Sequence, residues 1–235
     1  MKRAMIFAAG RGERMRPLTD STPKPLLEVG GKRLIEWHLE KLAAAGFSRV
    51  VINTSWLADQ FPEALGDGSR WNLGIDYINE GPVPLETGGG MLNALDLLGD
   101  ESFLLINGDV WTDMDFATLS QPVDSEAHLL MVANPAHVAR GDFALEANGY
   151  LVDSGPARLT YSGIGLYRAS LFADWQSAFA THADAYETPP RFPLAPLLRD
   201  AMHRQKISGE FSSAEWFDIG TPQRLAALDG LLHKR

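Results

Sequence analysis

The sequence predicts an α/β fold with a mainly parallel β-sheet, and three observations support this prediction. Over the first half of the chain, short apolar segments alternate with segments of helical periodicity. Strands that alternate with helices form parallel sheets that helices cover on both faces. Beyond Asp113 the pattern changes to consecutive strand-like segments, which are typical of antiparallel pairing. The chain has 235 residues, of which 45% are hydrophobic, so it is long enough for a sizeable core.

The first half begins with an apolar strand and an amphipathic helix. Residues 4–10 read AMIFAAG, and residues 34–45 repeat apolar side chains at helical spacing until Gly46 ends the helix. His38 lies on the apolar face of this helix, so we expect it to be structural. Further strands are expected at 49–54, 74–79 and 102–109, and helices at 56–65 and at 87–99, where Thr87 is the expected N-cap.

The second half is expected to form a small antiparallel lobe followed by a return to helices. Strands are predicted at 128–134, 142–153, 158–168, 206–212 and 215–220, and helices at 170–182, 192–205 and 221–235. Asn148–Gly149 is typical of a tight hairpin turn, and Thr221 with Pro222 is typical of a helix start. The sequence thus predicts a doubly wound, Rossmann-like mixed sheet flanked by helices. We expect one domain, 1–235, with a first part at 1–113 and a second at 114–235.

Composition and charge exclude several classes of protein. Cysteine is absent, which excludes disulfides, thiolate zinc sites and cysteine nucleophiles. The net charge is −9, yet the first 49 residues carry ten Lys and Arg side chains against five Asp and Glu. This local excess favours a small anion over nucleic acid, which needs an extended positive face. The apolar start is too short for a signal peptide or a membrane span, so we expect a cytoplasmic protein without a membrane partner.

Much of the positive charge lies in one loop directly after the first strand, residues 8–26, AAGRGERMRPLTDSTPKPL. Ligands of open parallel sheets bind beyond the carboxyl ends of the strands, and glycines let backbone N–H groups approach an anion. Met15 stands where a dinucleotide fingerprint or a Walker loop requires glycine, so neither motif is present. Long loops are usually functional. We therefore interpret this one as a phosphate-binding loop, against the alternative of an ordinary surface loop.

The loop resembles the signature of the sugar-nucleotide pyrophosphorylases, nucleotidyltransferases that join an NTP to a sugar 1-phosphate. Their pattern reads approximately L-A-A-G-x-G-T-R-L-x-P-L-T-x-x-x-P-K-x-L. This chain has F-A-A-G-R-G-E-R-M-R-P-L-T-D-S-T-P-K-P-L, with Glu13 and Met15 as the departures. The resemblance extends to WFDIGTPQRL at residues 216–225, so it covers essentially the whole chain.

Catalytic and metal-binding residues follow from the resemblance. A triphosphate substrate needs a hard divalent cation with oxygen ligands, normally Mg²⁺. The resemblance assigns this ion to Asp109 and Asp218, the β- and γ-phosphates to Arg14, and the α-phosphate with the sugar phosphate to Lys24. Arg14, Lys24 and Asp109 are thus the expected catalytic residues. The attacking phosphate oxygen is already anionic, so no protein base is expected, and catalysis consists of positioning and charge neutralisation.

A second nucleotide-binding segment is expected at residues 85–90, LETGGG. It resembles the family segment that lies against the nucleobase, in members whose base is uracil, so UTP is the implied donor. The alternative is a glycine-rich helix start used for close packing. The expected nucleotide-binding residues, besides Arg14 and Lys24, are Ala9, Gly10, Arg11, Gly12, Glu13, Glu86, Thr87, Gly88 and Asn107.

The sugar is expected to bind to the antiparallel lobe. The segments RGDF, LTYSGIGLY and NGDVWTD are similar to those of family members that act on N-acetylmuramic acid 1-phosphate in peptidoglycan recycling. The expected sugar-binding residues are Asn107, Gly141, Asp142, Tyr161, Ser162 and Gly163. A lactyl carboxylate needs a cation or backbone donors, and Arg140, Arg158 and Arg191 are unranked candidates. Mannose, glucose and N-acetylglucosamine 1-phosphates are alternative substrates.

Two other functions compete with nucleotidyl transfer. Asp113 and Asp115 form a D-x-D of the kind that glycosyltransferases use for a metal–nucleotide, but such an enzyme leaves the opening loop unexplained. A nucleotide-sensing module without turnover is disfavoured because Lys24, Asp109 and Asp218 are all present. The expected partners are therefore UTP and a sugar 1-phosphate, with Mg²⁺ as cofactor, in a monomer or small homo-oligomer.

Overall fold

The computed structural model describes residues 2–180 and 183–234. Its contacts divide the chain into two compact units, which are described separately. Unit 1 comprises Met1–Pro84, Ile106–Thr118 and Ala214–Arg235, and unit 2 comprises Leu85–Leu105 and Leu119–Ser213. The boundaries differ from the expected division at residue 113 because the last segment of the chain joins unit 1. A single functional domain stays a prediction.

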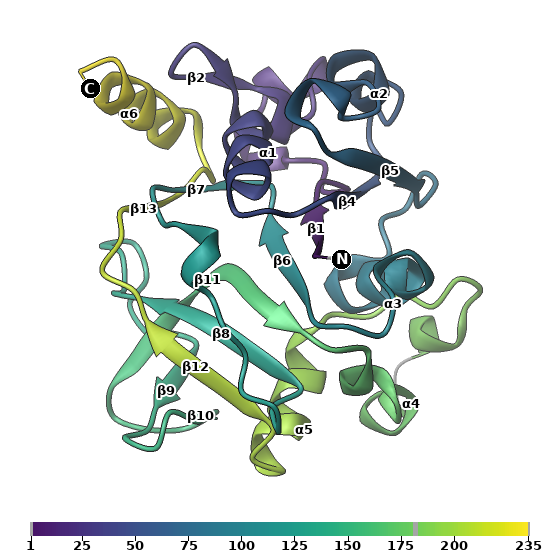
Figure 1. The fold of residues 1–235 in the computed structure, drawn as a ribbon, viewed down its shortest axis with the longest axis vertical. Helices are drawn as coiled ribbons and strands as arrows, with labels where there is room; N and C mark the ends of the chain where they lie inside the picture. The colour runs from purple at the N-terminus through teal and green to yellow at the C-terminus, as the bar shows by residue number, and fades with distance from the viewer. Residues whose placement is uncertain (1, 181–182, 235) are drawn as a thin grey trace. The chain divides into compact units, whose positions relative to one another are not determined.

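Unit 1 contains a parallel sheet (Figure 1). Strand β1 (Arg3–Phe7) pairs in parallel with β4 (Arg49–Thr54), which pairs in parallel with β5 (Gly74–Asn79). The strand on the other side of β1 is β6 (Phe103–Asn107), whose last two residues belong to unit 1. The central side chains of β1 and β4 are buried, as expected for parallel strands with both faces covered.

Helices and two short antiparallel pairs complete unit 1. The helices are α1 (Leu34–Ala44), α2 (Gln60–Leu65) and α6 (Pro222–Leu232). The pairs are β2 (Glu28–Val29) with β3 (Lys32–Arg33), and β7 (Val110–Thr112) with β13 (Trp216–Asp218). Single 3₁₀ turns lie at Glu13–Met15, Leu18–Asp20, Lys24–Leu26, Ser69–Trp71 and Phe116–Thr118. A buried cluster that includes Met15, Leu34, Trp111, Ile219 and Leu228 joins the loop, α1, β7 and α6.

Unit 2 combines antiparallel and parallel pairing. Its strands are the start of β6, then β8 (Ala127–Val132), β9 (Phe143–Leu145), β10 (Leu151–Val152), β11 (Arg158–Tyr167) and β12 (Ile207–Phe211). Pairing is antiparallel between β11 and β8, β11 and β9, and β9 and β10, and parallel between β8 and β12. Figure 1 shows β8, β11 and β12 side by side. The helical elements are α3 (Glu86–Leu98), α4 (Trp175–Ala178) and α5 (Ala195–His203), with 3₁₀ turns at Ala169–Phe172 and Ala183–Tyr186.

The structure confirms the predicted α/β class, a mixed and mainly parallel sheet flanked by helices. The strands β4 and β5 have the predicted bounds. The predicted hairpin turn is also confirmed, because Gly149 has a φ of 83° and its N–H donates to the Glu146 carbonyl at 3.0 Å. Thr221 caps α6, accepting a hydrogen bond from the Arg224 N–H at 3.4 Å.

Two local predictions are wrong. Thr87 does not cap α3, which begins one residue earlier, at Glu86; the Thr87 hydroxyl instead accepts a hydrogen bond from the Leu194 N–H at 2.9 Å. The helix expected at 170–182 is reduced to a 3₁₀ turn and the short α4, and residues 181–182 lie outside the described residues. Trp175 stacks on Phe192 at a centroid distance of 4.7 Å, and the Phe179 ring packs against Phe192 in a tilted arrangement at 4.5 Å. This aromatic packing outweighs helix propensity, which is a weak preference.

Candidate active site

A buried hydrogen-bond chain fixes the start of the loop after β1. The Ala8 N–H donates to Asn53 Oδ1 at 2.9 Å, and Asn53 Nδ2 donates to Glu80 Oε1 at 2.7 Å. All three residues are buried, so these bonds are formed away from water and hold the backbone firmly. Neither Asn53 nor Glu80 was predicted from the sequence. The available signal was a polar residue at the carboxyl end of two successive predicted strands.

The loop is folded back on itself. Gly12 has a φ of 67°, in the left-handed region that favours glycine. Its carbonyl accepts hydrogen bonds from the Met15 N–H and the Thr19 hydroxyl, both at 2.8 Å. The Trp56 indole N–H donates to the Thr19 carbonyl at 3.0 Å. These bonds give an irregular segment a defined backbone, on which the cationic side chains are mounted.

The four cations of the loop have different surroundings. Arg16 pairs with Asp20 through Nε, at 2.6 Å, and the Arg11 guanidinium lies over the Trp56 ring at 4.7 Å. Lys24 points to Asp109 and is described below. The exposed side chain of Arg14 extends toward Gly220: a Cβ atom on that glycine would lie 3.4 Å from Arg14 Nη2. Arg14 and Lys24 therefore both reach toward the segments that carry the two predicted metal ligands.

Lys24 and Asp109 form an ion pair. The distance from Lys24 Nζ to Asp109 Oδ2 is 2.8 Å, and the two side chains are 10% and 39% exposed. Gly108 makes this contact possible, because a Cβ atom there would lie 2.5 Å from the Phe7 carbonyl oxygen and 3.1 Å from Pro25 Cγ. The Gly108 N–H donates to the same Phe7 oxygen at 2.9 Å. The close approach of the two strand ends thus brings Asp109 to Lys24.

Asp218 lies on the strand that adjoins Asp109. In the antiparallel pair of β7 and β13, Asp218 is opposite Val110, and the Ile219 N–H donates to the Asp109 carbonyl at 2.7 Å. The structure therefore places the backbone of two aspartates that are far apart in the sequence side by side, and a metal ion shared by their carboxylates stays a prediction. The Asp218 carboxylate accepts a hydrogen bond from Arg224 Nη1 and forms an ion pair with it.

His38 is a structural residue of unit 1, as its position on the apolar face of the first helix predicts. Its side chain is fully buried, with Nε2 at 2.8 Å from the Val110 carbonyl and the ring stacked on Phe116 at 6.4 Å. Burial lowers the pKa of His38 from 6.5 to about 4, because the charged form loses its hydration. At neutral pH the imidazole is therefore uncharged.

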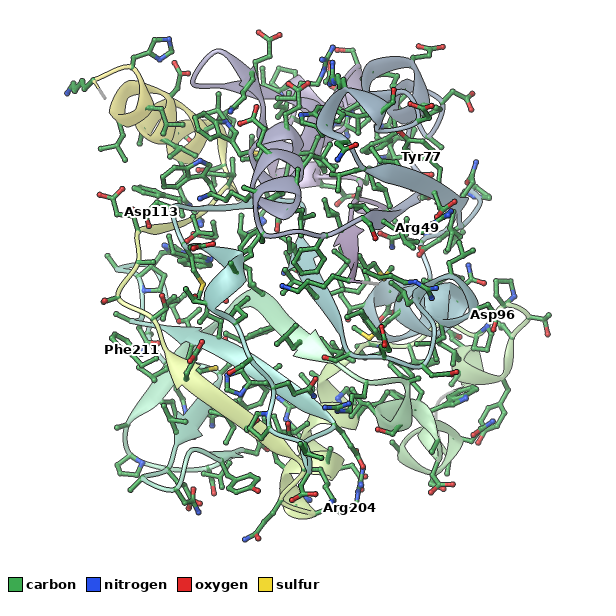
Figure 2. All side chains as sticks on the ribbon, viewed as in Figure 1. Arg49, Tyr77, Asp96, Asp113, Arg204 and Phe211 are labelled. Carbon is green, nitrogen blue, oxygen red and sulfur yellow. The ribbon has the colours of Figure 1, made fainter. Side chains whose placement is uncertain are left out.

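The aspartates of the D-x-D segment bind backbone groups of their own unit. Asp113, labelled in Figure 2, accepts a hydrogen bond from the Glu215 N–H at 2.8 Å through Oδ1. Asp115 Oδ1 accepts one from the Ala117 N–H at 2.9 Å. These bonds hold the turns that follow β7. A structural role therefore accounts for both carboxylates without a metal–nucleotide.

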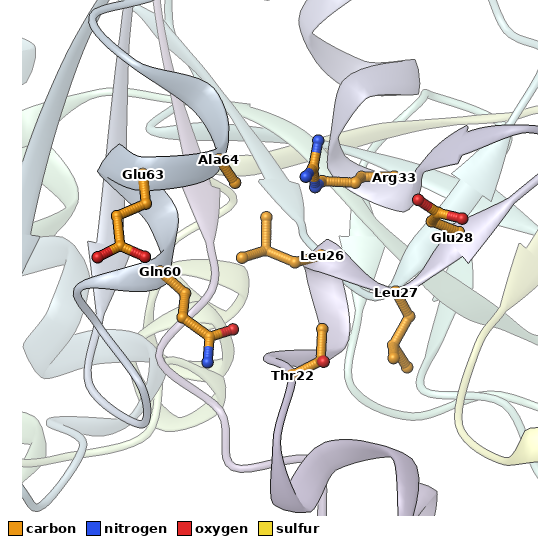
Figure 3. A pocket seen from close by; sticks show the side chains of 8 residues that line it. All are labelled: Thr22, Leu26, Leu27, Glu28, Arg33, Gln60, Glu63 and Ala64. Atoms are coloured by element: carbon orange, nitrogen blue, oxygen red, sulfur yellow. The ribbon is translucent and has the colours of Figure 1, made fainter.

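A cavity of about 540 Å³ lies beside the loop (Figure 3). Figure 3 shows Leu26 between Gln60 and Glu63 of α2 on one side and Arg33 and Glu28 on the other. The charged groups that line the cavity are therefore the Arg33 guanidinium and the carboxylates of Glu28 and Glu63. Such a lining repels a triphosphate, and neither of the predicted phosphate ligands, Lys24 and Arg14, lines this cavity.

The segment predicted to contact the base lies in unit 2, at the start of α3. Glu86 and Thr87 are exposed, and Glu86 has a φ of 63°. The N–H groups of Gly88 and Gly89 donate to the Phe192 carbonyl at 2.9 and 3.0 Å, and a Cβ on Gly88 would lie 2.5 Å from Phe192 Cδ2. Close packing thus accounts for these glycines, which was the alternative interpretation. A contact with the base stays a prediction.

The predicted sugar-binding residues of unit 2 gather around the irregular part of β11. Asp142 Oδ2 accepts a hydrogen bond from the Tyr161 N–H at 2.8 Å, and the hydroxyls of Tyr161 and Tyr167 lie 2.8 Å apart. Pairing with β8 shifts in register after Tyr161, and Gly163 has a φ of 76° there. Ser162 is fully buried. These residues shape a bulge, which often adjoins a functional site.

The candidates for the lactyl carboxylate differ in their pairing. Arg158 donates to the Asp142 carbonyl and lies 3.5 Å from Asp153, and Arg191 pairs with Asp184. Arg140 is exposed, next to Gly141. A Cβ on Gly141 would lie 2.6 Å from Asn134 Oδ1 and from the Leu159 carbonyl oxygen, so this glycine serves close packing.

Comparison with known proteins identifies the family. The family model described as nucleotidyl transferase matches residues 3–141. The chain is 46% identical over 236 residues to N-acetylmuramate alpha-1-phosphate uridylyltransferase of Neisseria meningitidis serogroup B, covering 97% of each chain. It belongs to the nucleotidyl transferase family. A protein of the same name from Caulobacter vibrioides is 31% identical over 250 residues, covering 98% of this chain and 97% of that protein.

A solved structure confirms the nucleotidyltransferase fold. A Bacillus anthracis crystal structure assigned as a glucose-1-phosphate thymidylyltransferase, in complex with sucrose, matches with a TM-score of 0.82. The match covers 100% of this chain and 96% of that one at 19% sequence identity. The predicted family, its α/β fold and its enzymatic class are thus confirmed. In the described part of the chain, no helix combines the length and the apolar character needed to cross a membrane.

The residues of this nucleotidyltransferase fit the divalent metal that the family generally uses. Asp109 lies in the turn before β7 and Asp218 on the adjoining strand β13, and both side chains are partly exposed. Within residues 2–180 and 183–234, no group of three or more His, Cys, Asp and Glu could hold a metal ion. A hard cation that keeps several waters and takes further ligands from substrate phosphates needs only one or two carboxylates. The pair Asp109 and Asp218 matches that requirement.

Proposed function

We propose that this nucleotidyltransferase transfers UMP from UTP to N-acetylmuramic acid 1-phosphate, giving UDP-N-acetylmuramic acid and pyrophosphate in peptidoglycan recycling. The observation that carries the reaction class is the ion pair between Lys24, in the loop with the family signature, and Asp109, which lies beside the segment of Asp218. The choice of sugar is supported by identity to the Neisseria meningitidis enzyme along almost the entire length of both chains.

The nucleophile needs no base from the protein. A phosphate oxygen of the sugar 1-phosphate attacks the α-phosphorus of UTP, and the bond from that phosphorus to the oxygen bridging to the β-phosphate breaks. The electron pair leaves with pyrophosphate. Since the attacking oxygen is anionic at neutral pH, the enzyme acts by alignment and by neutralising charge. The neutral, buried His38 agrees with this division of roles.

Two cations of unit 1 bind the phosphates in this proposal. Lys24 neutralises the α-phosphate and the incoming sugar phosphate, and its almost buried position strengthens each of these interactions. Arg14 binds the β- and γ-phosphates, for which a planar guanidinium with several N–H donors is well suited. The N–H groups of Ala9, Gly10, Arg11, Gly12 and Glu13 are the proposed backbone contacts of the phosphate chain.

Asp109 and Asp218 would hold Mg²⁺. When bound, this ion neutralises charge on the reacting phosphates and on the departing pyrophosphate. The Asp109 carboxylate is also the ion-pair partner of Lys24, so the lysine lies next to the place where the reacting phosphates are proposed to bind. Asn107, two residues before Asp109, is the proposed contact of ribose or sugar.

Unit 2 supplies the proposed contacts of the base and the sugar. Glu86, Thr87 and Gly88 are assigned to uracil, with the exposed Glu86 as the group that reads its polar edge. Among the sugar-binding candidates, Asp142 and Tyr161 already bind each other, so their role is to shape the site. Arg140 is the candidate for the lactyl carboxylate, since Arg158 and Arg191 are paired with acidic side chains.

Pyrophosphate release tests this function. The enzyme is incubated with UTP and Mg²⁺ and with the 1-phosphates of N-acetylmuramic acid, N-acetylglucosamine, glucose or mannose. We expect turnover with the first sugar, loss of turnover with EDTA and its return on adding Mg²⁺. Replacing UTP by dTTP measures the donor preference. Turnover confined to glucose or mannose 1-phosphate would refute the sugar assignment, and no pyrophosphate with any sugar would refute the reaction class.

A further inference from the structure

Arg224 is a cation of unit 1 that the predicted site does not include. It is the third residue of α6, and its N–H is bonded to the capping hydroxyl of Thr221. Its guanidinium faces Asp218: Nη1 contacts the carboxylate and lies 3.4 Å from the Asp218 carbonyl. About a quarter of each side chain is exposed, so solutes can reach this pair.

Arg224 and Arg14 converge on one point. A Cβ atom on Gly220 would lie 3.3 Å from Arg224 Nη1 and 3.4 Å from Arg14 Nη2. Gly220 is buried and follows Asp218 by two residues. Two guanidinium groups from opposite ends of the chain therefore share a small region, where the Asp218 carboxylate is the anion that offsets their repulsion. Such a pair of planar groups is suited to a phosphate, which arginine binds through two parallel hydrogen bonds.

Each of the two proposed metal ligands forms an ion pair with a cationic side chain. Asp109 is paired with Lys24, and Asp218 is paired with Arg224. A divalent cation on either carboxylate repels the cationic side chain that is bonded to it. For Lys24 the alternative partner is the substrate phosphate. Because Arg224 lies beside the proposed phosphate ligand Arg14, the same alternative is open to Arg224.

From these contacts we infer that Asp218 exchanges Arg224 for the metal ion, and that the released guanidinium binds the pyrophosphate part of the nucleotide together with Arg14. The inference rests on the proposed function, because it takes the metal ligands and the phosphate site from there. It adds Arg224 as a substrate-binding residue. It also makes Asp218 the residue that couples metal binding to phosphate binding.

The inference predicts effects of opposite sign for one substitution. In Arg224→Gln the side chain loses its charge, so Asp218 binds a divalent cation without competition. Mn²⁺ affinity of the free enzyme, followed by the electron paramagnetic resonance signal of unbound Mn²⁺, should rise by roughly three- to tenfold. Affinity for pyrophosphate in the presence of Mg²⁺, measured by calorimetry, should fall by roughly ten- to a hundredfold.

Three further variants separate this coupling from damage to the fold. Gln223→Ala changes the exposed neighbour in the first turn of α6, and Arg204→Gln removes an arginine of unit 2 that is paired with Glu126; both should keep the two affinities of the wild type. Arg224→Lys keeps the charge but not the planar group. It should bind Mn²⁺ within about twofold of the wild type and pyrophosphate with an intermediate affinity. This variant decides the question if Arg224→Gln does not fold.

Two results overturn the inference. If Arg224→Gln binds pyrophosphate like the wild type, Arg224 is not a phosphate ligand. If its Mn²⁺ affinity is unchanged or falls, Arg224 does not compete with the metal and only holds Asp218 in place. Neither measurement includes a sugar 1-phosphate. Failure of every sugar to support turnover would therefore refute the proposed function while these two affinities still test Arg224.

Discussion

The loop after β1 in unit 1 and the first turn of α3 in unit 2 both contain glycines. The space beside Gly10 in the loop is open, whereas the space beside Gly88 in the helix is filled. No described atom beyond the chain neighbours lies within 4 Å of a Cβ built on Gly10. A Cβ on Gly88 would collide with Phe192. Cations are close to Gly10 and absent from the first turn of α3, which carries Glu86. The space beside Gly10 is therefore available to a ligand, whereas the space beside Gly88 is occupied by Phe192.

The largest test of this contrast is Lys24→Gln. Removal of one preorganised donor at developing charge costs about 10²–10³-fold in kcat, so we expect a loss of that size in pyrophosphate release. The free energy of unfolding should change little, because Asp109 is 39% exposed and water can solvate it. Arg16→Gln is the matched control, since Arg16 is a loop cation already paired with Asp20. Equal losses in both variants would contradict a specific role for Lys24.

A second substitution tests the buried core of unit 1 instead of the loop. In His38→Gln the amide nitrogen can still donate to the Val110 carbonyl, which Nε2 contacts in the wild type, but the side chain no longer titrates. The folded-state pKa of His38 is lowered from 6.5 to about 4. The contribution of His38 to the free energy of unfolding is therefore complete above pH 6.5. It falls by on the order of 3 kcal/mol as the pH falls to 4, because the unfolded chain binds the proton more readily.

Urea unfolding of both proteins between pH 4 and pH 8 measures this effect. The difference in the free energy of unfolding between wild type and His38→Gln should fall steadily below pH 6.5. A constant difference would show that the pKa of His38 is the same in the folded and the unfolded protein. Profiles of activity against pH for the two proteins then separate two causes of lower activity at low pH. One is the protonation of the substrate phosphates, and the other is the unfolding of the strand next to Asp109.

Gly88→Ala tests the filled space beside Gly88. The new methyl group would overlap Phe192, and overpacking of this kind costs about 1–3 kcal/mol. Urea unfolding should show the loss. The control is Gly230→Ala in α6, where a Cβ meets no described atom within 4 Å; it should gain up to about 1 kcal/mol from helix propensity. An unchanged stability with poorer UTP binding in Gly88→Ala would reverse the comparison and favour the base-binding role.

Gly10→Ala is expected to have the smallest effect on stability and a clear effect on the substrate. Since the position is open, the free energy of unfolding should change by no more than about 0.5 kcal/mol. The methyl group would lie where the phosphate chain is proposed to approach the backbone, and one such group is worth about tenfold in affinity. Calorimetric titration with UTP measures it. An unaltered UTP affinity would move the phosphate site away from Gly10.

The sequence was most informative where chemistry and local pattern coincide. Lys24 belongs to a signature of fixed order after β1, Asp109 follows the buried strand β6, and the structure places the two in contact. Their contact with the segment of Asp218 depends on the pairing of β7 with β13, which no periodicity reveals, so only the family resemblance linked them.

Other features depend on partners that a local pattern cannot supply. No local pattern singles out Asn53 or Arg224. Asn53 matters because it accepts a hydrogen bond from Ala8, and Arg224 because it donates one to Asp218. Thr87 has the chemistry of an N-cap, but the Leu194 N–H recruits its hydroxyl. For Asn53 and Thr87 a residue distant in the chain decides the outcome, and for Arg224 a residue six positions earlier does.

Unit 1 is assembled from three separate stretches of chain, and the last of them brings β13 and α6. During synthesis, the loop with Lys24 and the turn with Asp109 leave the ribosome long before Asp218. A polypeptide released at residue 213 would contain Lys24 and Asp109 but lack Asp218, β13 and α6. Under the proposed function, premature termination therefore yields an inactive product instead of a partly active one, and adding a peptide of residues 214–235 in trans tests whether activity returns.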